Sequence, residues 1–115
     1  LLMPANSEES KIVDELTAQG DEIVLTKTTD SALTGTNLRL ILRNMGIENV
    51  VIAGIFTDQC ISSTVRSLAD ESFNVIVVED CCAAATEQLH RNELEIINMI
   101  YCHVVSSEEL SGFYC

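Results

Sequence analysis

Basic residues are scarce in this chain of 115 residues, where six lysines and arginines stand against eighteen aspartates and glutamates. The formal net charge of -12 repels the phosphate backbone of nucleic acids and anionic membrane surfaces. We therefore expect neither a nucleic acid nor a membrane as a partner. The acidic excess does not point to a substrate, because solvated carboxylates are common on protein surfaces.

Proline occurs once, and the apolar runs, such as Val50 to Ile55, are far too short to span a bilayer. With 47% hydrophobic and 21% charged residues, the composition is typical of a compact globular protein, and the length indicates one domain over residues 1–115. The five cysteines lack the spacing of a disulfide framework or a zinc site, which favours a reducing, cytoplasmic location. We expect no metal and no cofactor, and no phosphate loop, nucleophile-elbow serine or dinucleotide fingerprint is present.

Short apolar runs alternate with segments of helical periodicity along the chain. Buried strands are predicted over residues 21–27, 49–54, 74–79 and 102–105. Helices are predicted around residues 12–16, over 36–45, from 57 to 68, over 87–100 and from 106 onward. Because each strand is apolar on both faces, the pattern indicates an α/β fold with a doubly wound parallel sheet and helices on both of its faces.

The carboxyl ends of parallel strands are where ligands bind in open α/β sheets, which draws attention to Lys27 and Cys60. Cys60 falls in the first turn of a predicted helix, where unpaired amides and the positive end of the helix dipole favour a thiolate. Alternatively, Cys60 is a small buried hydrophobic residue and Lys27 an ordinary lysine at a strand end. Their predicted convergence at one sheet edge favours a nucleophile beside a cation. His90 and His103 have no metal-like partner at short spacing and receive no role in the site.

Three blocks of sequence resemble those of the isochorismatase-like cysteine hydrolases, a family that includes nicotinamidases, ureidoacrylate amidohydrolases and carbamoyl-amide hydrolases. The first block runs from Lys27 through Ser31-Ala32-Leu33 to Gly35-Thr36 and Leu38. The second is Gly54-Ile55-Phe56-Thr57-Asp58-Gln59-Cys60, followed by Thr64 and Arg66. The third is Val77-Val78-Glu79-Asp80-Cys81-Cys82-Ala83-Ala84 with His90. Their common order and spacing make the resemblance specific, and it covers nearly the whole chain from Pro4.

The resemblance implies a catalytic triad of Asp, Lys and Cys, of which Lys27 and Cys60 occupy matching positions. The Asp, and the metal ligands of those members that bind a metal, would lie upstream of Leu1. The implied fold is a Rossmann-like three-layer domain, and we expect this chain to be its C-terminal portion, with the N-terminal strands of the sheet missing. A fragment of this kind should expose apolar strand faces and should lack a fixed separation between Lys27 and Cys60.

The resemblance also implies how the site is built. Backbone amides of Cys60 and of Phe56 or Thr57 would stabilise a tetrahedral oxyanion, next to a cis peptide bond between Ile55 and Phe56. The substrate pocket would include Asp30, Leu33 and Phe56. Asp30 stands where an aromatic residue is usual and Leu33 replaces the usual Phe, so the pocket wall should differ from that of aromatic-lined relatives.

The implied function is hydrolysis of a C–N bond in a small amide or carbamoyl substrate through a thioester on Cys60. Family members that cleave the vinyl ether of isochorismate can lack the cysteine, so Cys60 favours amide cleavage over that alternative. A third possibility is a non-catalytic α/β binding domain in which Cys60 serves only in packing. For the enzyme we expect a small-molecule substrate and a homo-oligomeric protein.

Overall fold

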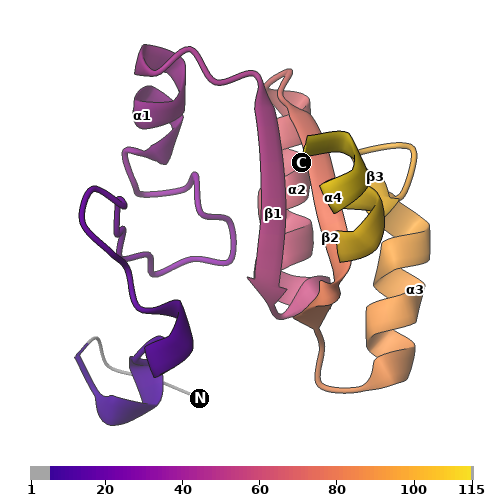
Figure 1. The fold of residues 1–115 in the computed structure, drawn as a ribbon, viewed down its shortest axis with the longest axis horizontal. Coiled ribbons are helices and arrows are strands. Elements are labelled where there is room, and N and C mark those ends of the chain that lie inside the picture. Colours follow the sequence, from indigo (N-terminus) through magenta and orange to yellow (C-terminus); the bar gives the residue numbers. More distant parts are fainter. Residues whose placement is uncertain (1–5, 115) are drawn as a thin grey trace.

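The computed structural model describes residues 6–114 and contains a sheet of three parallel strands in the order β1-β2-β3 (Figure 1). The strands are β1 (Asn49–Ile55), β2 (Asn74–Ala83) and β3 (His103–Val105). The helices are α1 (Leu38–Asn44), α2 (Ser62–Asp70), α3 (Glu87–Ile97) and α4 (Ser107–Tyr114). A parallel sheet with helical crossovers confirms the predicted α/β class.

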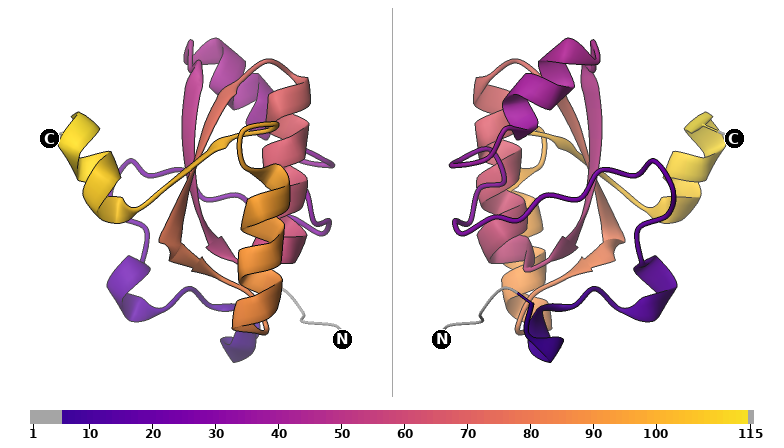
Figure 2. Two further views of the ribbon diagram at one scale, coloured as in Figure 1. Left: turned by 90° about the vertical axis from the view of Figure 1, so that its right-hand side faces the viewer. Right: turned by 90° about the vertical axis from the view of Figure 1, so that its left-hand side faces the viewer.

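The helices lie on both faces of the sheet, as the apolar strands predict. Figure 2 shows α2 and α3 on one face and α4 on the other. The core lies between the sheet and the α2–α3 layer, where Val65 and Leu68 of α2 meet Val77 of β2 and Ile97 of α3, all of them at most 1% exposed. Burying such aliphatic side chains supplies most of the driving force for folding. The two helices are also joined through Glu93, which accepts hydrogen bonds from Ser62 and Arg66.

Two elements predicted for the N-terminal part of the chain are absent from the structure. In place of a helix around residues 12–16 there are two short 3-10 turns, Glu8–Ser10 and Asp14–Leu16. Residues 21–27 form no strand, and Ile23 and Val24 are 57% and 71% exposed. Both predictions were wrong for the same reason: the apolar side chains find no partner within residues 6–114, and secondary structure of this kind depends on tertiary packing.

The segment before α1 lies on the outer side of β1, away from β2 (Figure 1). Within residues 6–114, β1 pairs only with β2, so its other edge is open. Val51 and Ile55 of β1 are 47% and 62% exposed. The edge of the sheet next to residues 6–36 is therefore unpaired, and β1 also carries exposed apolar side chains.

The carboxyl ends of β1 and β2 deviate from regular pairing. Ile52 pairs with Val77, but Gly54 pairs with Cys82, so the register shifts between the two pairs. Gly54 has a φ of 132°, a backbone conformation that favours glycine, and a Cβ there would lie 3.4 Å from Cδ1 of Ile61. The irregularity ends β1 directly before the turn that carries Cys60.

Asp80, at the same end of the sheet, is engaged in holding α4. Its carboxylate accepts hydrogen bonds from the backbone amide and the hydroxyl group of Ser107, the first residue of that helix. The Ser107 hydroxyl and amide together hold the pKa of Asp80 below its ordinary value. This carboxylate therefore serves the packing of α4 and lies apart from Cys60.

Candidate active site

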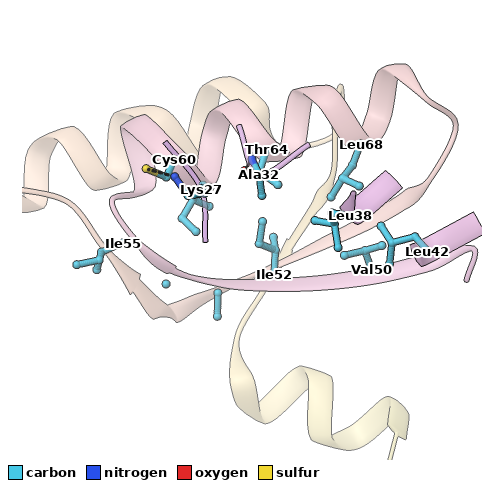
Figure 3. Close-up of a pocket in the computed structure, with 13 residues that line it drawn as sticks. Lys27, Ala32, Leu38, Leu42, Val50, Ile52, Ile55, Cys60, Thr64 and Leu68 are labelled. Atoms are coloured by element: carbon cyan, nitrogen blue, oxygen red, sulfur yellow. Dashed lines mark hydrogen bonds between the residues drawn. The ribbon is translucent and has the colours of Figure 1, made fainter. Parts of the chain in front are cut away.

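Lys27 and Cys60 meet although 33 positions separate them in the chain. The Lys27 Nζ lies 3.3 Å from the Cys60 Sγ (Figure 3). It also donates hydrogen bonds to the backbone carbonyls of Thr29 at 2.6 Å and Asp30 at 3.2 Å. The two carbonyls hold the ammonium group in place beside the sulfur. The arrangement brings a cation and a nucleophilic side chain within hydrogen-bond distance of each other.

Cys60 lies in the first turn of a continuous helical segment. Residues Thr57–Ile61 form a π-helical turn that leads directly into α2. Such turns are frequent at functional sites because they redirect one side chain out of the regular helix. The sulfur is half-buried, at the end of the sheet where β1 terminates.

The backbone around this turn carries the groups assigned to the oxyanion. The peptide bond between Ile55 and Phe56 is cis. The amides of Gln59 and Ile61 both donate to the carbonyl of Phe56, at 3.0 and 3.2 Å. Those two amides are therefore already used, and the assignment of Cys60 with Phe56 or Thr57 as oxyanion donors stays a prediction.

The loop that supplies Lys27 is tied to α2 by side-chain hydrogen bonds. The hydroxyl of Ser31 donates to that of Ser67 at 2.8 Å, and the amide of Ala32 donates to the Thr64 hydroxyl at 3.0 Å. Leu33, next in the chain, is 2% exposed and packs in the main core. These contacts anchor the loop to the helix that follows Cys60.

An apolar groove of about 370 Å³ runs from the Lys27–Cys60 pair along the face of β1 (Figure 3). Its lining comes from the Lys27 loop, α1, β1 and the Cys60 turn with α2. Leu38 and Leu42 of α1 lie at one end with Val50, and Cys60 lies at the other. The nucleophile is therefore open to the groove rather than enclosed in the core.

The three residues assigned to the substrate pocket lie in different surroundings. Leu33 is in the core and does not line the groove. Phe56 is 39% exposed beside the Cys60 turn. Asp30 is exposed, and its Oδ1 accepts a hydrogen bond from the Cys60 thiol at 3.6 Å. Sequence reasoning placed Asp30 in the pocket wall but did not foresee its contact with the sulfur.

His90 is a site-supporting residue that sequence reasoning missed. Its Nδ1 lies 2.7 Å from the hydroxyl of Thr57, and the two side chains are 3% and 0% exposed. Because Thr57 begins the turn that carries Cys60, the pair fixes that turn against α3. The helical periodicity of α3 places His90 on the buried face with Leu94 and Ile97, which was the available signal.

Replacing His90 with alanine should lower the free energy of unfolding by about 2 to 4 kcal/mol, because it leaves the buried Thr57 hydroxyl without a partner and opens a cavity. Urea unfolding followed by circular dichroism measures the change. The control is His103→Ala, at an exposed strand position, which should change stability by no more than about 0.5 kcal/mol. Equal losses in the two variants would contradict the structural role of His90.

Two further classes of feature are missing from residues 6–114. No group of three or more His, Cys, Asp or Glu side chains in this range is arranged to hold a metal ion. None of the helices over the same residues has the length and apolar character needed to cross a bilayer.

Comparison with known proteins shows the family to which this chain belongs. The model of the isochorismatase domain matches residues 2–109. The isochorismatase family protein YecD of Escherichia coli O157:H7, which is uncharacterized, is 36% identical over 95 residues, covering 83% of this chain and 50% of the relative.

Two solved structures show the same fold. An isochorismatase-like hydrolase from Alkaliphilus metalliredigens superposes with a TM-score of 0.91 at 28% identity, covering 96% of this chain and 60% of the other. N-carbamoylsarcosine amidase from Thermoplasma acidophilum superposes with a TM-score of 0.78 at 31% identity, covering 90% of this chain and 58% of the other. The chain thus spans between half and three fifths of the length of these proteins. On its sequence and its fold alike, it belongs to the isochorismatase family.

Proposed function

We propose that the protein is a hydrolase that cleaves the C–N bond of a small amide or carbamoyl compound through a thioester on Cys60. The observation that carries the proposal is the Lys27 ammonium, 3.3 Å from a cysteine in the first turn of a helical segment. Reactive cysteines are commonly found beside a cation and at the start of a helix. A half-buried thiol open to a groove can also reach a substrate carbonyl.

The chemistry proceeds in two stages. The Cys60 sulfur attacks the substrate carbonyl carbon, and its proton passes to a base; the tetrahedral oxyanion then collapses, the C–N bond breaks, and the amine leaves with that proton. Water next attacks the thioester carbonyl, and the sulfur leaves as a thiolate. By resemblance to the family, the base is an aspartate carboxylate from the segment upstream of Lys27, and Lys27 stabilises the charges on both partners.

One relative supports amide cleavage in particular. The amidase from Thermoplasma acidophilum acts, by its name, on an N-carbamoyl compound. Cleavage of a vinyl ether needs no cysteine nucleophile, whereas this chain places a cysteine beside a lysine. A cytoplasmic location and a homo-oligomeric state complete the proposal and rest on the sequence.

Iodoacetamide at neutral pH should label Cys60 at least about tenfold faster than the other cysteines within residues 6–114, because only its sulfur lies beside an ammonium group. Burial raises the pKa of Cys102 to about 11, and burial also raises the pKa of Cys82, so both thiols stay protonated and slow. Mass spectrometry of the tryptic peptides measures each rate.

Cys81 is the matched comparison, because it is an exposed free thiol with no lysine among its hydrogen-bond partners. Loss of the fast phase in Cys60→Ser identifies the labelled residue. Labelling of Cys60 at no more than the rate of Cys81 would count against an activated nucleophile.

A further inference from the structure

Asp30 places a carboxylate directly against the reacting sulfur. Its Oδ1 lies 3.6 Å from the Cys60 Sγ, and the side chain is exposed to solvent. The next two residues, Ser31 and Ala32, are hydrogen-bonded to α2, so the backbone that bears Asp30 is held in place. Any group attached to the sulfur therefore lies within a few ångströms of this carboxylate.

The charge of this carboxylate is not neutralised by the neighbouring lysine. The Lys27 Nζ donates to the backbone carbonyls of Thr29 and Asp30 and to the sulfur, and not to the Asp30 carboxylate. Among residues 6–114, Asp30 takes part in none of the five ion pairs. Its oxygens thus keep free lone pairs beside the Cys60 sulfur.

An ionised carboxylate can only accept hydrogen bonds, and it repels other carboxylates. A substrate that presents an ammonium group or an N–H donor next to the scissile carbonyl should bind more tightly at Cys60. A substrate that presents an acid group there should bind less tightly. In an aromatic-lined pocket the corresponding position would instead offer a ring face. The charge of the side chain at this position would therefore favour substrates of one charge over those of the other.

We propose that Asp30 selects substrates that carry a cationic or hydrogen-bond-donating nitrogen group beside the scissile carbonyl, and disfavours substrates that carry a carboxylate there. The proposal rests on the proposed function in one respect, that Cys60 is the attacking nucleophile. Asp30 is a specificity-determining residue in this scheme.

The test uses three methanethiosulfonate reagents, which differ in charge but react alike: the sulfur of Cys60 forms a disulfide bond and methanesulfinate leaves. The reagents are the cationic trimethylammonioethyl, the anionic sulfonatoethyl and the neutral methyl compounds. The full-length protein is compared with Asp30→Asn and with the control Glu108→Gln, an exposed acidic position on α4. Modification of the Cys60 peptide is followed by mass spectrometry.

When the charge of a bound reagent lies about 6 Å from the Asp30 carboxylate in a water-like medium, that carboxylate changes the reaction rate by about threefold, in opposite directions for the cationic and the anionic reagent. The ratio of cationic to anionic rates should therefore fall about tenfold in Asp30→Asn, while the neutral reagent changes little and Glu108→Gln leaves all three rates as they are. An unchanged ratio overturns the proposal. An equal fall for all three reagents also overturns it, because Asp30 would then activate the thiol itself.

These rates require no turnover, so they are independent of whether the protein hydrolyses an amide. A second arm measures kcat/KM for two amides that differ only in an amino or a carboxylate substituent beside the carbonyl. Asp30→Asn should lower the preference for the amino compound about tenfold. Absence of turnover by the unmodified protein would refute the proposed function, and the thiosulfonate ratio would still decide whether Asp30 selects by charge at the sulfur.

Discussion

Replacing Cys60 with alanine should reduce hydrolysis by the full-length protein by about five to six orders of magnitude, because removal of a covalent nucleophile leaves only binding and oxyanion stabilisation. Release of ammonia or amine from a panel of small amides and carbamoyl compounds measures the loss. The fold should persist, since the half-buried thiol is replaced by a smaller side chain at the start of a helical segment.

Cys81→Ala serves as the matched control, because Cys81 is an exposed free cysteine on β2 and has no part in the proposed chemistry. Its turnover should equal that of the unmodified protein. Turnover of an authentic substrate by Cys60→Ala at even a hundredth of the normal rate would exclude the thioester mechanism.

Replacing Lys27 with methionine should lower kcat by about two to three orders of magnitude, a loss typical of removing one electrostatic contact to the transition state. Methionine is unbranched like lysine and only one atom shorter, but it removes the charge 3.3 Å from the Cys60 sulfur. Alkylation of Cys60 by iodoacetamide should slow in the same variant, which separates an effect on the nucleophile from an effect on substrate binding.

The chain has one other lysine, Lys11, which pairs with Glu8 in an exposed 3-10 turn. Lys11→Met removes the same charge at a site where surface ion pairs contribute little, so both turnover and alkylation should stay unchanged. If Lys27→Met alkylates at the normal rate, the ammonium group does not act on the sulfur.

The central strands and helices could be predicted from the sequence because their periodicity reflects burial that the fold realises. β1 and β2 appear where short continuous apolar runs predict them, and α2 and α3 follow the helical spacing of their buried residues. The predicted strand at residues 21–27 failed because a strand needs a hydrogen-bonded neighbour. Residues 21–27 do contain a short apolar run, but Ile23 and Val24 remain exposed within the described part of the chain.

Only part of the site could be predicted from the sequence. The meeting of Lys27 and Cys60 follows from the sequence blocks, which carry both residues at fixed places. Side-chain contacts across long stretches leave no periodic trace, so the approach of Asp30 to the sulfur and the pairing of Thr57 with His90 became visible only in three dimensions. The structure places the Lys27 Nζ 3.3 Å from the Cys60 Sγ, and the expectation that their separation is not fixed stays a prediction.

The hydrogen bonds between the Lys27 loop and α2 explain that separation. Hydrogen bonds attach the loop at Ser31 and Ala32 to Ser67 and Thr64, on the helix that continues from the Cys60 turn. The nucleophile and its cation are therefore linked to the same helix. Small shifts of the sheet then move both groups together. The residues of α1 and β1 that line the groove also pack against the core, so substitutions there would reshape the groove only within the limits of core packing. New substrates could arise in such a protein without the nucleophile having to be rebuilt.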